Sequence, residues 1–153
     1  MSGGPRPPLT SVLFVCTLNS VRSPMAEGLA RQLLGRAIYI DSAGLQRADR
    51  DAFALAVLKE CGIDLDEDEH RTLREVDVEG FDLVITLSGE AHAVISERLR
   101  ATAQHHLNWP IDDPTMAGRT RDTKLAAYRA VRDQIRSLIK SELVPLQKPR
   151  PQC

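Results

Sequence analysis

Cysteine is scarce in this sequence, which has three cysteines among 153 residues. So small and odd a number makes no disulfide framework and is typical of a reducing compartment, so we expect a cytoplasmic protein. The cysteines and histidines also lack metal-site spacing, because His105 and His106 are adjacent and neither Cys61 nor Cys153 has a close partner. We therefore expect no metal and no other cofactor.

Long apolar runs and an excess of charge of one sign are also missing. No run approaches the roughly 20 residues of a membrane-spanning helix. Residues 1–10 lack the apolar core of a signal peptide and, being rich in proline and glycine, are expected to be disordered. The net charge is −1, which argues against nucleic acid or a membrane surface as a partner. Residues 141–153 carry three prolines and are expected to form a flexible tail, which leaves residues 11–140 as a single domain.

The stretch 11–34, SVLFVCTLNSVRSPMAEGLARQLL, combines a strand, a loop and a helix. The continuous apolar run from Val12 to Val15 is typical of a buried strand in a parallel sheet. Ser23 suits the N-cap of a helix, and Pro24 suits its first position. A stripe of apolar residues at helical spacing follows.

A loop between a strand and a helix directs several main-chain N–H groups at one point, beside the positive end of the helix dipole. Such a loop binds an anion. Cys16 lies at its floor, where the same donors would stabilise a thiolate and lower the pKa of Cys16. Arg22 can offer two donors to a tetrahedral anion, and Ser23 can donate to the sulfur. A thiolate beside a phosphate site is a nucleophile for phosphoryl transfer.

The simpler interpretation is that Cys16 is a small buried hydrophobe and Arg22 is solvated. The spacing Cys-x5-Arg is weak by itself, but the polar loop, the Ser-Pro pair, the preceding strand and the following helix together favour the functional interpretation. The residues predicted to bind substrate are Thr17, Leu18, Asn19, Ser20, Val21, Arg22 and Ser23.

The rest of the chain alternates strands with helices. Strands are expected at residues 37–40, 81–87 and 106–109, and helices at 51–61, 88–99 and 122–139. This pattern predicts an α/β fold with a four-stranded open parallel sheet and helices on both faces. Ligands bind beyond the carboxyl ends of such strands, so Cys16 and Asp113, which both follow strands, belong at the same edge.

The segment VLFVCTLNSVRSPMAEGLA resembles the start of a low-molecular-weight protein tyrosine phosphatase, a family that includes the thioredoxin-coupled arsenate reductases. The resemblance extends from about residue 11 to residue 139. Further matching segments are Asp41-Ser42-Ala43-Gly44, Gly62-Ile63-Asp64, His70-Arg71, Asp82 to Thr86 and Asp113-Pro114. The resemblance implies that Cys16 is the nucleophile, that Arg22 binds phosphate and that Asp113 is the general acid. It also favours loop support by Asn19 and by Ser42, which spacing alone would assign to an ordinary turn.

Several positions depart from the family pattern. Leu18 replaces a usual glycine and either shapes the mouth of the pocket or strains the loop. Many members have a second cysteine at the position of Val21. Tyrosine-specific members usually have two tyrosines where Thr115 and Met116 stand, whereas the Trp-x-x-Asp-Asp-Pro segment that begins at Trp109 resembles the arsenate reductase branch.

That branch uses two further cysteines after the third strand. This chain has Ser88 there and no cysteine between Cys61 and Cys153, so an internal disulfide relay is not expected. Asp112 is a candidate orienting neighbour of Asp113, although an Asp-Pro pair is also common in plain turns.

Three functions remain open. The first is hydrolysis of phosphomonoesters, notably protein phosphotyrosine, through a phosphocysteine, with Asp113 as acid and then base. The second is arsenate reduction with an external thiol such as glutathione. The third is a non-catalytic module that binds an oxyanion or a phosphopeptide. The expected partners are a phosphorylated protein or a small phosphomonoester, with phosphate or another oxyanion in the loop.

Overall fold

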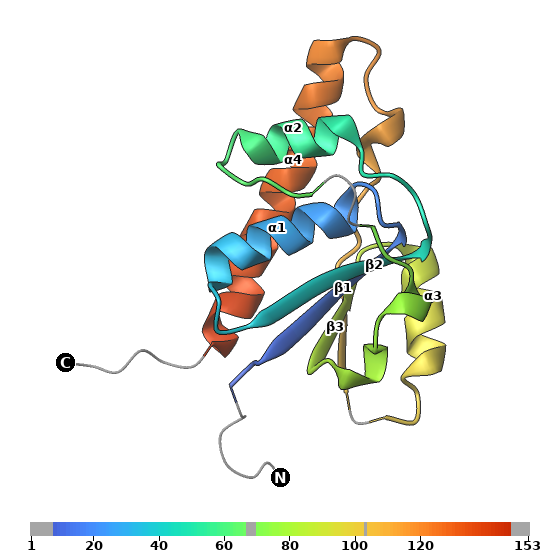
Figure 1. The fold of residues 1–153 in the computed structure, drawn as a ribbon. Coiled ribbons are helices and arrows are strands. Elements are labelled where there is room, and N and C mark those ends of the chain that lie inside the picture. Colours follow the sequence, from blue (N-terminus) through green and yellow to red (C-terminus); the bar gives the residue numbers. More distant parts are fainter. Residues whose placement is uncertain (1–7, 67–69, 103, 148–153) are drawn as a thin grey trace, which may run out of the picture.

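The computed structural model describes residues 8–66, 70–102 and 104–147, so the first seven residues and the end of the expected tail, with Cys153, lie outside the described residues. Four parallel strands form one sheet in the order β2-β1-β3-β4 (Figure 1). They are β1 (Ser11–Leu18), β2 (Tyr39–Gln46), β3 (Leu83–Thr86) and β4 (His105–Asn108). The α/β fold and parallel sheet expected from the sequence are confirmed.

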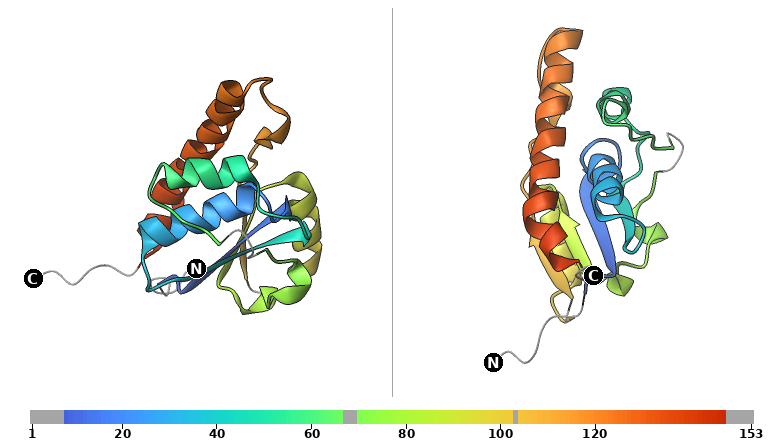
Figure 2. Two further views of the ribbon diagram at one scale, coloured as in Figure 1. Left: turned by 45° about the horizontal axis from the view of Figure 1, so that its top comes forward. Right: turned by 90° about the vertical axis from the view of Figure 1, so that its left-hand side faces the viewer.

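Helices cover both faces of this sheet. Three of them, α1 (Arg22–Leu34), α2 (Ala52–Lys59) and α4 (Arg121–Leu138), pack together on one face, and α3 (Gly89–Arg98) covers the other (Figures 1 and 2). Because side chains alternate along a strand, β1 contributes to both cores. Phe14 and Cys16 lie in the core under α1 and α4, whereas Leu13 and Val15 lie in the core under α3.

Side-chain caps fix where α2 and α3 begin. The Asp51 carboxylate accepts hydrogen bonds from the main-chain N–H groups of Phe53 and Ala54 at the start of α2, at 2.8 and 3.1 Å. The Ser88 hydroxyl accepts from the N–H of Ala91 at the start of α3. Each cap satisfies main-chain donors that have no partner inside the helix.

The second strand is longer than the sequence suggests. The segment Asp41-Ser42-Ala43-Gly44, which was expected to form a turn, continues β2 and pairs in register with β1 from Leu13 to Cys16. A run of small residues is typical of a turn when the sequence is considered alone. Here pairing with β1 satisfies the main-chain groups of these residues and keeps them extended.

The domain extends beyond both expected boundaries. A π-helical turn (Ile139–Leu143) and a 3₁₀ turn (Val144–Leu146) follow α4, and Leu143 is fully buried. The N–H of Leu9 donates to the carbonyl of Leu146 at 3.2 Å. Residues 141–147 therefore pack on the domain instead of belonging to a loose tail. In the part of the chain that the structure describes, no helix is long and apolar enough to cross a membrane.

Candidate functional site

The Cys16 thiol lies at the floor of the loop between β1 and α1. Its side chain is buried, and Sγ lies 2.6 Å from the carbonyl oxygen of Leu18 and 2.8 Å from the hydroxyl oxygen of Ser23. The sequence predicted the contact with Ser23, and the structure brings the two groups together.

Burial raises the pKa of the Cys16 thiol, so the lowered pKa expected from the sequence is wrong for this structure. The hydroxyl and main-chain N–H of Ser23 and the positive charge of Arg22 act in the opposite direction. The expectation counted the donors around the thiolate but not the loss of solvent around a residue at the floor of the loop.

Ser23 is not the N-cap of α1. The helix begins at Arg22 with Val21 as its N-cap, and no side chain caps it. Ser23 therefore lies in the first turn, where its hydroxyl contacts the thiol of Cys16. The cap prediction is wrong because a serine before a proline is typical of an N-cap, whereas the hydroxyl of this serine contacts the sulfur of Cys16.

Asn19 and Ser42, which the family resemblance assigns to loop support, form buried hydrogen bonds next to the loop. The Asn19 amide nitrogen donates to the hydroxyls of Ser23 at 2.9 Å and Ser42 at 3.0 Å. The Asn19 side-chain oxygen accepts from the main-chain N–H of Arg71 at 3.0 Å. Asn19 is fully buried, so these bonds join the loop to β2 and to the segment after α2.

Sequence reasoning missed a buried charge that continues this network. The hydroxyl of Ser42 donates to the carboxylate of Glu27 on α1, which also lies 2.6 Å from an Arg31 nitrogen and 3.4 Å from an Arg50 nitrogen. Glu27 and Arg50 are both buried, and burial raises the pKa of Glu27. The only hint in the sequence is that Glu27 lies among small residues on the buried side of a helix.

The other loop residues turn their side chains away from the thiol. Thr17 donates to the hydroxyl of Ser88 at 3.0 Å, Ser20 donates to the carbonyl of Asp49 at 2.7 Å, and Val21 is buried in the core. None of these three side chains therefore forms a hydrogen bond with the thiol, and the main-chain N–H of Ser20 donates to the carbonyl of Leu18 at 2.8 Å.

Leu18 does not strain the loop. It pairs with Gln46 at the end of β1, and no residue other than glycine has a positive φ among those that the structure describes. Its side chain is 41% exposed, so Leu18 forms an apolar part of the loop surface. Of the two alternatives drawn from the sequence, shaping the mouth fits this geometry.

Arg22 and Asp113 lie at the same edge of the sheet although 91 positions separate them. The Arg22 guanidinium donates to the carbonyl of Ile111 at 2.9 Å, and its other terminal nitrogen lies 4.0 Å from the Asp113 carboxylate. Trp109 and Ile111, both buried, anchor this loop beside the end of β3. Asp112 is exposed and makes no hydrogen bond or ion pair with any described residue.

The arrangement can support nucleophilic attack on a tetrahedral oxyanion. It combines a thiol, a guanidinium that can hold oxygens, and a half-exposed carboxyl group that can exchange protons. No group of three or more His, Cys, Asp or Glu side chains that could hold a metal occurs within residues 8–66, 70–102 and 104–147.

Comparison with known proteins gives a consistent family. Residues 11–151 match the family model described as low molecular weight phosphotyrosine protein phosphatase. Arsenate reductase of Halalkalibacterium halodurans is 36% identical over 130 residues, which are 85% of this chain and 92% of that protein. Arsenate reductase of Bacillus subtilis is 35% identical over 131 residues, covering 84% and 91% of the two chains.

Solved structures of an arsenate reductase and of a phosphatase share the fold. An arsenate reductase in the phosphate-binding state has a TM-score of 0.76 and 28% identity, and covers 91% of this chain and all of its own. A low molecular weight protein tyrosine phosphatase from T. tengcongensis has a TM-score of 0.74 and 29% identity, covering 90% and 99%.

Proposed function

The chain belongs to the low molecular weight phosphotyrosine protein phosphatase family, and from that premise we propose that it hydrolyses phosphomonoesters, protein phosphotyrosine among them, through a phosphocysteine at Cys16. The observation that supports the proposal is the approach of Asp113 to within 4.0 Å of Arg22, at the edge where β1 delivers Cys16. A proton donor and an oxyanion ligand thus stand beside one nucleophile.

In the first step the Cys16 thiolate attacks phosphorus in line with the leaving oxygen. Arg22 and the loop N–H groups hold the three other oxygens, and protonated Asp113 gives its proton to the departing oxygen. The products are the free alcohol or phenol and the phosphocysteine.

In the second step water attacks the phosphocysteine while the Asp113 carboxylate accepts a proton from it. The bond between phosphorus and sulfur breaks, and Ser23, 2.8 Å from Sγ, donates to the sulfur as it leaves with its electron pair. Phosphate is released, and the thiolate and the protonated Asp113 are restored.

The residues next to the loop favour hydrolysis over reduction by an internal relay. Reduction of arsenate needs a second thiol to attack the cysteine adduct, whereas hydrolysis needs only water. The side chain that contacts Thr17 of the loop is Ser88, which has a hydroxyl and no thiol. The thiol of Cys61 is engaged elsewhere, because its sulfur accepts a hydrogen bond from Arg136 on α4.

Arsenate reduction with an external thiol is the second candidate, and the names of the curated relatives favour it. Arsenate would form the adduct on Cys16, and a low-molecular-weight thiol such as glutathione would attack that adduct. The released product would be arsenite, and the two sulfurs would end as a mixed disulfide.

The test is to assay the purified protein with an aryl phosphate, with a phosphotyrosine peptide, and separately with arsenate and glutathione. We expect phosphate release from both esters. Cys16→Ser should abolish turnover but retain phosphate binding, and Arg22→Lys should also be inactive because a point charge cannot replace the planar guanidinium.

Near-normal ester hydrolysis in either variant would refute the proposal. Arsenite production without ester hydrolysis would establish the second candidate instead. Phosphate binding without either activity would identify a non-catalytic oxyanion-binding module.

A further inference from the structure

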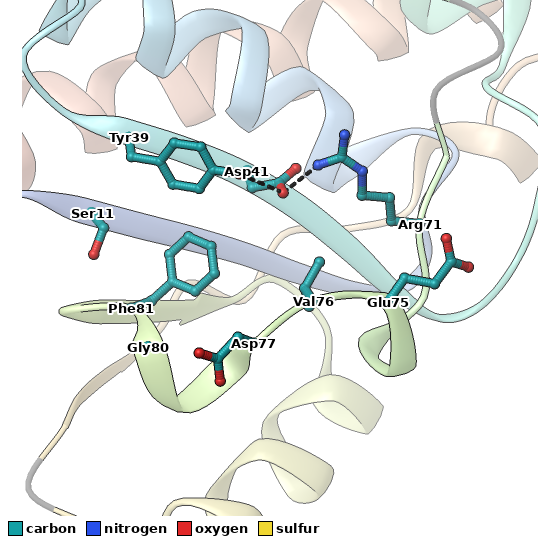
Figure 3. Close-up of a pocket in the computed structure, with 9 residues that line it drawn as sticks. All are labelled: Ser11, Tyr39, Asp41, Arg71, Glu75, Val76, Asp77, Gly80 and Phe81. Carbon is teal, nitrogen blue, oxygen red and sulfur yellow. Dashed lines mark hydrogen bonds and ion pairs between the residues drawn. The ribbon is translucent and has the colours of Figure 1, made fainter.

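A cavity of about 330 Å³ lies between the first residues of β1 and β2 and residues 71–81 (Figure 3). Tyr39 and Ser11, the first residues of their strands, are among its lining residues. Cys16 lies toward the opposite end of β1, so the cavity is separate from the proposed phosphate loop, residues 16–23.

Two aromatic rings form one wall. Tyr39 and Phe81 stack with their centroids 5.7 Å apart and their planes 29° apart. Tyr39 is 61% exposed, which leaves much of its surface open to a further partner. An aromatic pair of this kind can be extended by another flat ring.

The charged groups of the cavity leave one carboxylate without a counterion. Arg71 pairs with Asp41, and Glu75 pairs with Arg47 outside the cavity. Asp77 forms no ion pair with the residues that the structure describes. Its carboxylate folds over Gly80, where one oxygen lies 2.6 Å from the position that a Cβ would take.

We propose that this cavity binds a small organic cation that carries a flat ring, such as an arylalkyl ammonium ion. The ring would stack on the exposed ring of Tyr39, and the short chain would carry the positive charge to the Asp77 carboxylate, which Figure 3 shows turned toward Gly80. The volume suits one ring system with a short chain, since it lies at the lower end of the roughly 300–1,000 Å³ of small-molecule sites.

Three ligands with one ring system test the charge requirement. Tryptamine is a cation, tryptophol is its neutral analogue and indole-3-propionate is an anion. In NMR titrations of the ¹⁵N-labelled full chain, tryptamine should bind about three-fold more tightly than tryptophol, and the anion should bind most weakly. The largest shifts should fall on the amides of Tyr39, Asp77 and Phe81.

Matched variants test the site itself. Asp77→Asn keeps the shape of an exposed side chain and should reduce the affinity for tryptamine to that for tryptophol. Tyr39→Ser should weaken both ligands by about three-fold through loss of the ring. Asp64→Asn, which removes an exposed carboxylate outside the cavity, should change neither.

Equal affinities for the three ligands, or full tryptamine affinity in Asp77→Asn, would overturn the proposal. Shifts centred on residues 16–23 and 112–113 would also overturn it, because the cation would then lie beside Asp112 and Asp113 and not in the cavity.

Discussion

At Cys16, burial and hydrogen bonding act on the thiol in opposite directions. Burial raises the pKa, while Ser23 and Arg22 lower it, so the thiolate that attack requires depends on a few contacts. The hydroxyl of Ser23, at 2.8 Å from Sγ, is the contact that substitution can remove most cleanly. The reactivity of Cys16 therefore reports how far the contacts with Ser23 and Arg22 offset the rise in its pKa that burial causes.

Ser23→Ala should raise the pKa of Cys16 further, because it removes a hydrogen bond to the charged form. The rate of Cys16 alkylation by iodoacetamide at pH 7, followed by peptide mass spectrometry, should fall about ten-fold. The rate should recover as pH rises. Ser20→Ala is the control, because its hydroxyl bonds to the carbonyl of Asp49 and not to sulfur. Equal rates in the two variants would contradict the assigned contact.

Asp113 and Asp112 are neighbours with different surroundings. Of the two, only Asp113 approaches Arg22. Asp113→Asn should therefore lower the turnover of phenyl phosphate about 100-fold, because the leaving group of this ester needs a proton. It should lose much less with para-nitrophenyl phosphate, whose leaving group departs readily. Steady-state rates of Asp112→Asn provide the comparison. A larger loss in Asp112→Asn, or the same loss with both esters, would reassign the acid.

Among the elements, β2 and the phosphate loop pack too closely to allow a side chain between them. A Cβ on Gly44 would lie 2.4 Å from the main-chain nitrogen of Asn19, closer than real Cβ contacts. The absence of a side chain at Gly44 therefore lets β2 pack directly against the main chain of the loop. The glycine is needed for close approach and not for an unusual φ, because its φ is not positive.

Gly44→Ala should therefore push the loop away from β2. Overpacking of this kind costs about 1–3 kcal/mol of the free energy of unfolding, and Cys16 alkylation should change as Asn19 shifts. Gly89→Ala is the matched control, because a Cβ there meets nothing within 4 Å. Urea denaturation of both variants is the measurement. Unchanged stability in Gly44→Ala would contradict the close packing.

Glu27 on α1 contacts Ser42 on β2 and Arg50 before α2, so one carboxylate joins three parts of the fold. Burial raises the pKa of Glu27, so the folded chain holds its proton more tightly than the unfolded chain. This contribution to stability is present below the unfolded value of about 4.5 and is lost as pH rises through the folded pKa.

Glutamine cannot titrate, so the stability of the native sequence relative to Glu27→Gln should decrease as pH rises above about 4.5. Urea unfolding of both proteins at several values between pH 4.5 and pH 7.5 measures the difference. Glu142→Gln, at an exposed position, is the control. A difference that stays constant or grows with pH would contradict the assigned direction.

At the scale of the whole molecule, the topology was predictable and the buried charge of Glu27 was not. Alternating strands and helices were enough to bring Cys16 and Asp113 to one edge, because carboxyl ends of parallel strands share that edge. Glu27 was missed because a charged residue on a helix is ordinarily solvated, and only packing against Ser42 and Arg50 buries it. The extent of β2 was missed because register depends on pairing with β1.

The same topology separates the two described thiols. The carbonyl of Cys61 accepts a hydrogen bond from Gln32, which lies ten residues along α1 from Arg22. A helix rises 1.5 Å per residue, so Gln32 lies about 15 Å along α1 from Arg22, and Cys61 lies beside this far part of the helix. A disulfide needs Cα atoms within about 7 Å, so Cys61 cannot reach Cys16 without unfolding.

Oxidation of Cys16 should therefore proceed without internal rescue. Peroxide converts a thiolate to sulfenic acid, which a nearby thiol would trap as a disulfide. Val21 occupies the loop position where such a thiol could stand, so excess peroxide should carry Cys16 to sulfinic acid and inactivate the protein. Bound phosphate should slow the loss by covering the sulfur, and burial should make it slower than for an exposed thiolate.

Mass spectrometry of non-reduced peptides after graded peroxide, with activity measured before and after adding a thiol, is the test. Cys153 lies outside the described residues, so Cys153→Ser is treated in parallel to remove its thiol. Sulfinic acid at Cys16 and incomplete recovery of activity in both proteins are expected. A Cys16–Cys61 or Cys16–Cys153 disulfide with full recovery of activity would overturn the prediction and would restore an internal relay of the kind that arsenate reduction needs.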